Sequence, residues 1–203
     1  MSAAHLLPPT TIEPPRRKRF TRPEVQRLAE GGLLEGQRFE LIEGDLIDKM
    51  GQNPPHTYTL GLVLDWLAAI FGNKRLRGQV PIEVAAADQE RSSPEPDVAV
   101  LVEAKPEYQL RHPRGDELLL VVEVADTSAQ FDLTVKARLY ARAGVPEYWV
   151  LDIASRWLVI HRHPVDGEYR QVTRLSEQES ISLSGGGATS TVVISQLLPA
   201  QLA

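Results

Sequence analysis

The sequence has 203 residues, of which 42% are hydrophobic, so one domain with a substantial core is expected. It contains no cysteine, which excludes disulfide bonds, thiolate metal sites and cysteine nucleophiles. The net charge of -5 argues against a protein that coats nucleic acid nonspecifically, but it does not exclude a protein whose basic side chains are confined to one cleft. The sequence has no secretion signal and no apolar run near the roughly 18 residues that cross a membrane, so we expect a soluble cytoplasmic protein.

The chain begins with a segment that we expect to be disordered. Residues 1–19 are rich in proline and poor in apolar side chains, so they bury too little surface to offset their ordering entropy. Residues 20–203 are expected to form a single domain. Thr21 is a good helix N-cap, with Pro23 and Glu24 in the first turn, and it predicts a short helix that runs to residue 30.

A hairpin, a long helix and a series of strands are predicted next. Residues 38–43 and 45–50 flank Gly44, which is the pattern of two strands joined by a tight turn. Apolar side chains recur at helical spacing over residues 55–71. The remaining predicted elements are strands at 75–80, 82–85, 97–102 and 117–125, a helix at 132–143, strands at 148–152, 157–162 and 169–174, and a short C-terminal segment after the glycines at 185–187. This order predicts a mixed α/β domain.

Two carboxylates lie in predicted strands where an isolated charge would be costly. Residues 118–122 leave no polar face, so their strand is expected to be covered on both sides, yet Glu123 lies in the same run. An unpaired carboxylate there would cost several kcal/mol, so a positive charge must lie nearby. Asp97 begins another apolar strand. If the two strands are neighbours, both carboxylates can meet in one pocket that selects Mg²⁺ or Mn²⁺.

Each of these residues also has a simpler interpretation. Asp97 and Glu123 could mark strand ends in water, because their proximity is not visible in the sequence. Lys136 follows Asp132 by four residues on the predicted helix and precedes Tyr140 by four. That spacing is typical of a surface ion pair between Asp132 and Lys136, worth about 0.3–0.5 kcal/mol. From the pattern alone, such an ion pair is favoured over a catalytic lysine.

Three stretches of the sequence together carry the signature of a family. They are RFELIEGDL at residues 38–46, PDVAV at residues 96–100 and VVEVADTSAQFDLTVKARLYARAGVPEYWVLD at residues 121–152. They resemble the Uma-two restriction endonuclease family, a branch of the PD-(D/E)XK nuclease superfamily, and the resemblance extends over residues 20–198. It implies a restriction-endonuclease-like fold, in which a central mixed β-sheet is flanked by helices and carries metal-binding acids on adjacent strands.

The resemblance also implies an active site. By motif, Asp97 matches the superfamily aspartate and Glu123 the second acid, and these two would bind Mg²⁺ or Mn²⁺. The superfamily lysine two residues after the second acid is replaced here by Ala125, and the resemblance places the lysine at Lys136 on the following helix. Glu43 resembles a further acidic position of the family, which implies a catalytic role and the binding of a second metal ion.

Weaker candidates and the expected activity follow from the same resemblance. Glu40 or Asp45 could serve in place of Glu43. His56 and Gln79 are residue types that are frequent at these positions in similar sequences. The implied activity is Mg²⁺-dependent hydrolysis of phosphodiester bonds in DNA by an endonuclease, and a homodimer is expected by analogy because both strands must be cut.

Three other functions are compatible with the same residues. The chain could be a catalytically silent relative that binds nucleic acid or a protein partner, in which case it need not bind metal. A glycosidase with paired carboxylates would remain active in EDTA. A structural, oligomerising domain would neutralise Glu123 with Lys136 or an arginine and would show no activity. Serine catalysis and a phosphate-binding loop are poorly supported, because the sequence has neither a Gly-x-Ser-x-Gly nor a Walker motif.

Overall fold

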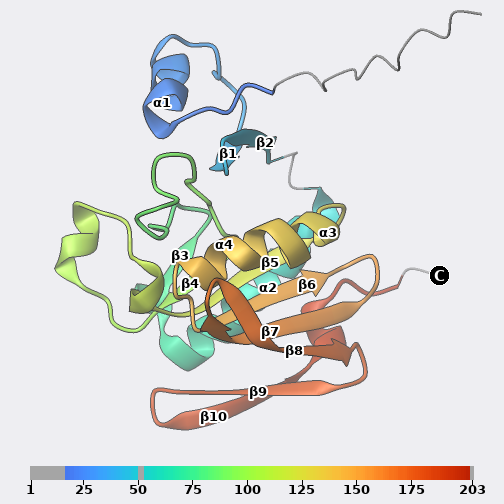
Figure 1. The fold of residues 1–203 in the computed structure, drawn as a ribbon. Coiled ribbons are helices and arrows are strands. Elements are labelled where there is room, and N and C mark those ends of the chain that lie inside the picture. Colours follow the sequence, from blue (N-terminus) through green and yellow to red (C-terminus); the bar gives the residue numbers. More distant parts are fainter. Residues whose placement is uncertain (1–16, 50–52, 202–203) are drawn as a thin grey trace, which may run out of the picture.

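A computed structural model describes residues 17–49 and 53–201 of the chain (Figure 1). Most of the N-terminal segment that the sequence predicts to be disordered, residues 1–16, therefore lies outside the described residues. The last residues of that segment make ordered contacts: Lys18 forms an ion pair with Glu24, and Arg19 forms one with Asp45. Thr21 caps the first helix as predicted, in a capping box with Glu24.

The helices and strands follow the predicted order, with a hairpin added at the C-terminal end. Their bounds are α1 Arg22–Glu30, β1 Phe39–Ile42, β2 Asp45–Asp48, α2 Pro54–Phe71, β3 Leu76–Gly78, β4 Val98–Leu101, β5 Leu118–Ala125, α3 Ala129–Phe131, α4 Ala137–Arg142, β6 Glu147–Asp152, β7 Trp157–Val165, β8 Glu168–Ser176, β9 Ser180–Gly185 and β10 Ala188–Val193. A π-helical turn, Asp132–Lys136, joins α3 to α4 in one continuous helical segment.

The centre of the fold is a six-stranded mixed sheet. Its strand order is β3-β4-β5-β6-β7-β8, and β5 and β6 are parallel while the other neighbours are antiparallel. A parallel pair needs a crossover connection, and the segment from α3 to α4 supplies it between β5 and β6. The mixed α/β fold expected from the sequence is therefore confirmed.

Both faces of the sheet are covered, as the continuous apolar run of β5 predicts. Val122 and Val124 point to the face where α2 packs, and they join a core with Trp149 and Leu158. Residues of opposite parity, such as Val121, pack with α4 on the other face. Figure 1 shows α2 and α4 on opposite sides of the sheet, with the β9–β10 hairpin beside α2.

Three predicted elements differ in detail. The predicted strand at residues 82–85 is reduced to an isolated bridge between Glu83 and Arg114. Of the glycines at 185–187, Gly185 ends β9, and Gly186 and Gly187 form the turn of the β9–β10 hairpin with φ values of 59° and 86°. The predicted helix at 132–143 begins earlier, at Ala129, and contains the π-helical turn. In the part of the chain that the structure describes, no helix combines the length and apolar character needed to cross a membrane.

Candidate active site

The pairing of β4 with β5 brings the two predicted acids together. Val98 lies opposite Val122 in this antiparallel pair, and one further residue along the same register places Asp97 opposite Glu123. Side chains directly opposite each other on neighbouring strands share a face of the sheet. The backbone N–H of Val124 also donates to Asp97 Oδ2 at 2.9 Å. The two acids therefore lie side by side, on the face that α4 covers.

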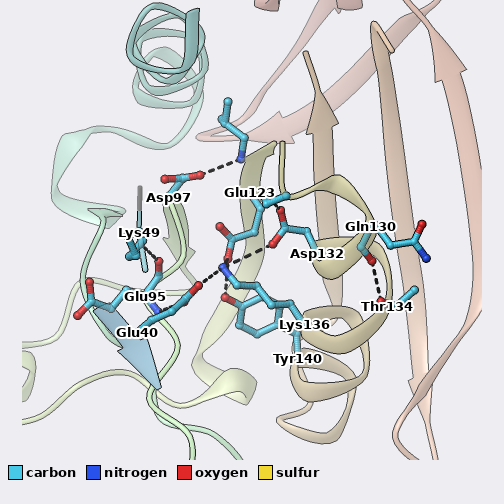
Figure 2. Close-up of polar contacts among 12 residues, drawn as sticks. Glu40, Lys49, Glu95, Asp97, Glu123, Gln130, Asp132, Thr134, Lys136 and Tyr140 are labelled. Carbon is cyan, nitrogen blue, oxygen red and sulfur yellow. Dashed lines mark hydrogen bonds and ion pairs between the residues drawn. The ribbon is translucent and has the colours of Figure 1, made fainter. Parts of the chain in front are cut away.

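The helical segment over this face adds a cation and further polar groups. Asp132, Lys136 and Tyr140 are spaced by four residues, so they project from one side of the segment towards β5 (Figure 2). The first two lie at the ends of the π-helical turn, in which the N–H of Ala137 bonds to the carbonyl of Asp132. Such turns are frequent at functional sites because they alter the direction of neighbouring side chains.

Lys136 lies at the centre of this cluster and is only 4% exposed. Its Nζ is 2.7 Å from Glu40 Oε1, 2.9 Å from Glu123 Oε1 and 3.6 Å from Asp132 Oδ1. The predicted pairing with Asp132 thus exists, but it is buried and is the longest of the three contacts. One ammonium group is shared by three buried carboxylates, which is not the arrangement of a surface ion pair.

The carboxylate of Glu123 is held from one side only. Its Oε1 accepts hydrogen bonds from Lys136 and, at 2.7 Å, from the hydroxyl of Tyr140. Its Oε2 has no hydrogen-bond partner among residues 17–49 and 53–201. Burial raises the pKa of Glu123 to about 8; Lys136 opposes this rise, and Asp97 and other nearby carboxylates add to it. This acid is therefore poorly compensated by the groups around it.

The carboxylate of Asp97 is held by three donors. His56 Nε2 lies 3.2 Å from Oδ2, the N–H of Val124 bonds to the same oxygen, and Gln79 Nε2 donates to Oδ1 at 3.2 Å. Burial acts to raise the pKa of Asp97, but the contact with His56 and the other hydrogen bonds outweigh it and leave the pKa below its ordinary value. The two weak sequence candidates, His56 and Gln79, thus both contact the same predicted acid.

The structure does not bring Glu43 into this cluster. Glu43 lies in the β1–β2 turn with a φ of 50°, and its exposed side chain accepts a hydrogen bond from Arg142 at 2.8 Å. The acid at the cluster is Glu40, which lies three residues earlier within β1 and is only 4% exposed. It accepts from the backbone N–H of Glu95 as well as from Lys136. The alternative noted for this position, Glu40, takes the place expected of Glu43.

These residues line a polar pocket of about 270 Å³. Arg38 and Lys49 from the β1–β2 hairpin also line it, and Lys49 Nζ donates to the carbonyl of Glu95 at 2.5 Å. The structure thus brings Asp97, Glu123 and Lys136 together. The four-residue spacing in the sequence already indicated that Asp132 and Tyr140 lie on the same side of the helical segment as Lys136. No comparable signal in the sequence pointed to Lys49.

The donor set at the pocket fits a hard divalent cation. A carboxylate has about four lone-pair sites, and at Asp97 three are used by hydrogen bonds, so one remains on Oδ1. Oε2 of Glu123 is open as well. Within residues 17–49 and 53–201, no three Asp, Glu, His or Cys side chains are gathered as a preformed metal site. Mg²⁺ does not require three protein ligands, because it is usually bound by one or two carboxylates and retains several waters.

Comparison with known proteins identifies the family of the chain. The model of the Uma2 family, described as "Putative restriction endonuclease", matches residues 22–191. The chain belongs to the Uma2 family. Membership supports a nuclease function in general and confirms the resemblance found in the sequence. No curated protein matches the chain.

A solved structure shares the fold. It is described as a "putative nuclease belonging to DUF820" from Anabaena variabilis ATCC 29413, and it is similar with a TM-score of 0.65 and 14% sequence identity. The match covers 88% of this chain and 97% of that chain. At this identity the similarity is one of fold, and it confirms the architecture expected for this chain, a mixed sheet flanked by helices.

Proposed function

We propose that this Uma2 protein is a metal-dependent endonuclease that hydrolyses phosphodiester bonds in DNA. The observation that supports this proposal most strongly is the position of Asp97 and Glu123. They lie on neighbouring strands, share one face of the sheet, and line the same polar pocket as Lys136. Each retains an oxygen with a lone pair that no hydrogen bond from the described residues uses, and a metal-dependent phosphodiesterase needs such oxygens as ligands.

Asp97 and Glu123 would hold Mg²⁺ or Mn²⁺. When bound, such an ion supplies polarisation of the scissile phosphate and a lowered pKa for a coordinated water. His56 and Gln79 keep Asp97 ionised and fix its direction, because both donate to its carboxylate. Mg²⁺ demands near-ideal geometry from its ligands, so this fixation contributes directly to the affinity of the site.

Lys136 and Tyr140 act on the other acid. Both donate to Oε1 of Glu123, so that Oε2 is turned away from the helix. The buried ammonium of Lys136 also provides fixed positive charge beside the position where negative charge accumulates during phosphodiester cleavage. Glu40 and Asp132 hold this ammonium in place.

The substrate would enter over the β1–β2 hairpin. Arg38 and Lys49 line the pocket, and Arg38 is exposed and forms no ion pair with the described residues. These cations can contact the phosphates on either side of the scissile bond without raising the net charge of the whole protein. A homodimer, which would present two such pockets to the two strands, belongs to the same proposal.

The proposal is tested with the purified Asp97→Ala variant on supercoiled plasmid DNA, with Mg²⁺, Mn²⁺ or EDTA. We expect wild-type cleavage only with a divalent ion and no cleavage by Asp97→Ala, with a cooperative thermal transition as the check that this variant is folded. Asp65→Ala, an exposed aspartate on α2, is the matched control and should cleave like the wild type. Cleavage by Asp97→Ala at the wild-type rate, or wild-type activity that persists in EDTA, would show that the proposal is wrong.

A further inference from the structure

The surroundings of Lys136 are built more like a cation site than like an ordinary lysine contact. An ammonium group has three N–H bonds, and here three carboxylates surround it at 2.7, 2.9 and 3.6 Å. Its side chain is 5% exposed, and those of its three partners are between 3% and 5% exposed. The lysine thus fills an acidic cage in the wall of the pocket, which these four residues also line.

We infer that Lys136 permanently occupies the position of a second metal ion, so that the pocket takes one divalent cation. This inference rests on the proposed function and specifies how the same site works. The first argument is the direction of the carboxylate oxygens. Oε1 of Glu40, Oε1 of Glu123 and Oδ1 of Asp132 face the ammonium. The open oxygens, Oδ1 of Asp97 and Oε2 of Glu123, are not among them.

The second argument is that the cage is fixed from outside. Oε2 of Glu40 accepts from the backbone N–H of Glu95 at 3.1 Å, and Oδ2 of Asp132 accepts from the hydroxyl of Ser128 at 2.5 Å. Neither acid can therefore turn towards another cation without losing a hydrogen bond. Figure 2 shows Lys136 between Glu40 and Asp132, with Asp97 apart from this group.

The third argument is electrostatic. A second divalent ion bound by Glu40 or Asp132 would lie within a few ångströms of the Lys136 ammonium, and like charges at that distance repel strongly in a buried site. The ammonium is held in this position by its contacts with three buried carboxylates. One metal ion and one lysine thus share the acids of this pocket.

The experiment counts bound Mn²⁺ by electron paramagnetic resonance and titration calorimetry, in the wild type and in Lys136→Met. Met has a similar length without the charge. We expect one Mn²⁺ per wild-type chain and a second, weaker Mn²⁺ in Lys136→Met. Lys105→Met, which removes an ammonium that pairs with Glu117 outside the pocket, is the matched control and should bind one.

A second variant covers the case in which Lys136→Met fails to fold because it leaves three buried acids without a cation. Glu40→Gln/Lys136→Met removes one charge of each sign, and it too should gain a second Mn²⁺ over the wild type. Two Mn²⁺ ions in the wild type would overturn the inference while leaving the proposed nuclease function intact. A single Mn²⁺ in a folded double variant would overturn it as well. No Mn²⁺ in the wild type would instead contradict the proposed function.

Discussion

Strand β5 has a buried acid near each end, and the two acids have opposite surroundings. Glu117 directly precedes the strand, and Arg111 donates to both of its oxygens, at 2.6 and 2.7 Å. The hydrogen bonds from Arg111 lower the pKa of Glu117 to about 2, against a smaller opposing effect of burial. Glu123, six residues on, shares one ammonium with Glu40 and Asp132, and burial raises its pKa to about 8.

The difference between these acids separates a structural role from a functional one. A bidentate arginine satisfies Glu117 completely, so this acid contributes to the stability of the folded chain. Glu123 has too little positive charge around it and keeps an open oxygen. A buried group with a strongly shifted pKa in a pocket is typical of a functional site, where stability is often lower than it could be.

The largest expected effect is on catalysis, and it should distinguish the two ends of the strand. Glu123→Gln keeps the size of the side chain but removes a proposed metal ligand, so we expect cleavage of plasmid DNA with Mg²⁺ to fall by at least about 100-fold. Glu117→Gln should retain the wild-type rate within about threefold, because it does not line the pocket. Equal loss in both variants would mean that the comparison is wrong.

The next largest effect is on stability, where we expect Glu117→Gln to lose more than Glu123→Gln. Glu117→Gln weakens the two hydrogen bonds from Arg111 to a buried carboxylate and leaves Glu107 as the remaining acidic partner of Arg111, so we expect a loss of about 1–3 kcal/mol in the free energy of unfolding. Glu123→Gln replaces a carboxyl group whose burial is poorly compensated, so it should change that free energy by less than about 1 kcal/mol, or increase it. Denaturant unfolding in EDTA measures both. A larger loss for Glu123→Gln than for Glu117→Gln would show that Glu123 is the structural acid.

The sequence predicted the strands and the two acids because both are local patterns. A run of apolar residues at 118–122 predicts a strand that is covered on both faces, and a carboxylate in that run can be recognised from the sequence alone. Lys136 was identified by resemblance and not by physics, since its spacing from Asp132 equally fits a surface pair. Its burial depends on how deeply the helical segment packs over β5, and the sequence does not contain that distance.

The third acid shows where sequence reasoning ends. Glu40 and Glu43 both belong to the predicted hairpin, and the difference between them depends on the turn. Glu43 and Gly44 form the turn, with φ values of 50° and 87°, so Glu43 points away to Arg142. Glu40 lies within β1 and points towards Lys136. Only the packing of this hairpin against α4, which joins elements far apart in the chain, decides which acid reaches the pocket.

The smallest expected effect is a pH dependence of stabilisation by metal. The folded state holds the proton of Glu123 more tightly than the unfolded chain, because the pKa rises from 4.5 to about 8. Without metal, the stability that this group contributes is thus present at low pH and is lost as the pH rises towards 8. Glu117 behaves in the opposite way: its contribution is present above pH 4.5 and is lost as the pH falls towards 2.

Under the proposed function, Mn²⁺ competes with the proton on Glu123, so the stabilising effect of Mn²⁺ should grow with pH. One pH unit corresponds to about 1.4 kcal/mol for a single proton, and we expect excess MnCl₂ to raise the melting temperature by about 2–4 °C more near pH 8 than one unit lower. Differential scanning fluorimetry of the wild type, Glu117→Gln and Glu123→Gln measures this. Glu117→Gln should keep the pH dependence and Glu123→Gln should lose it. If both variants keep it, the competing proton is not on Glu123, and the contrast between the two ends of β5 does not extend to metal binding.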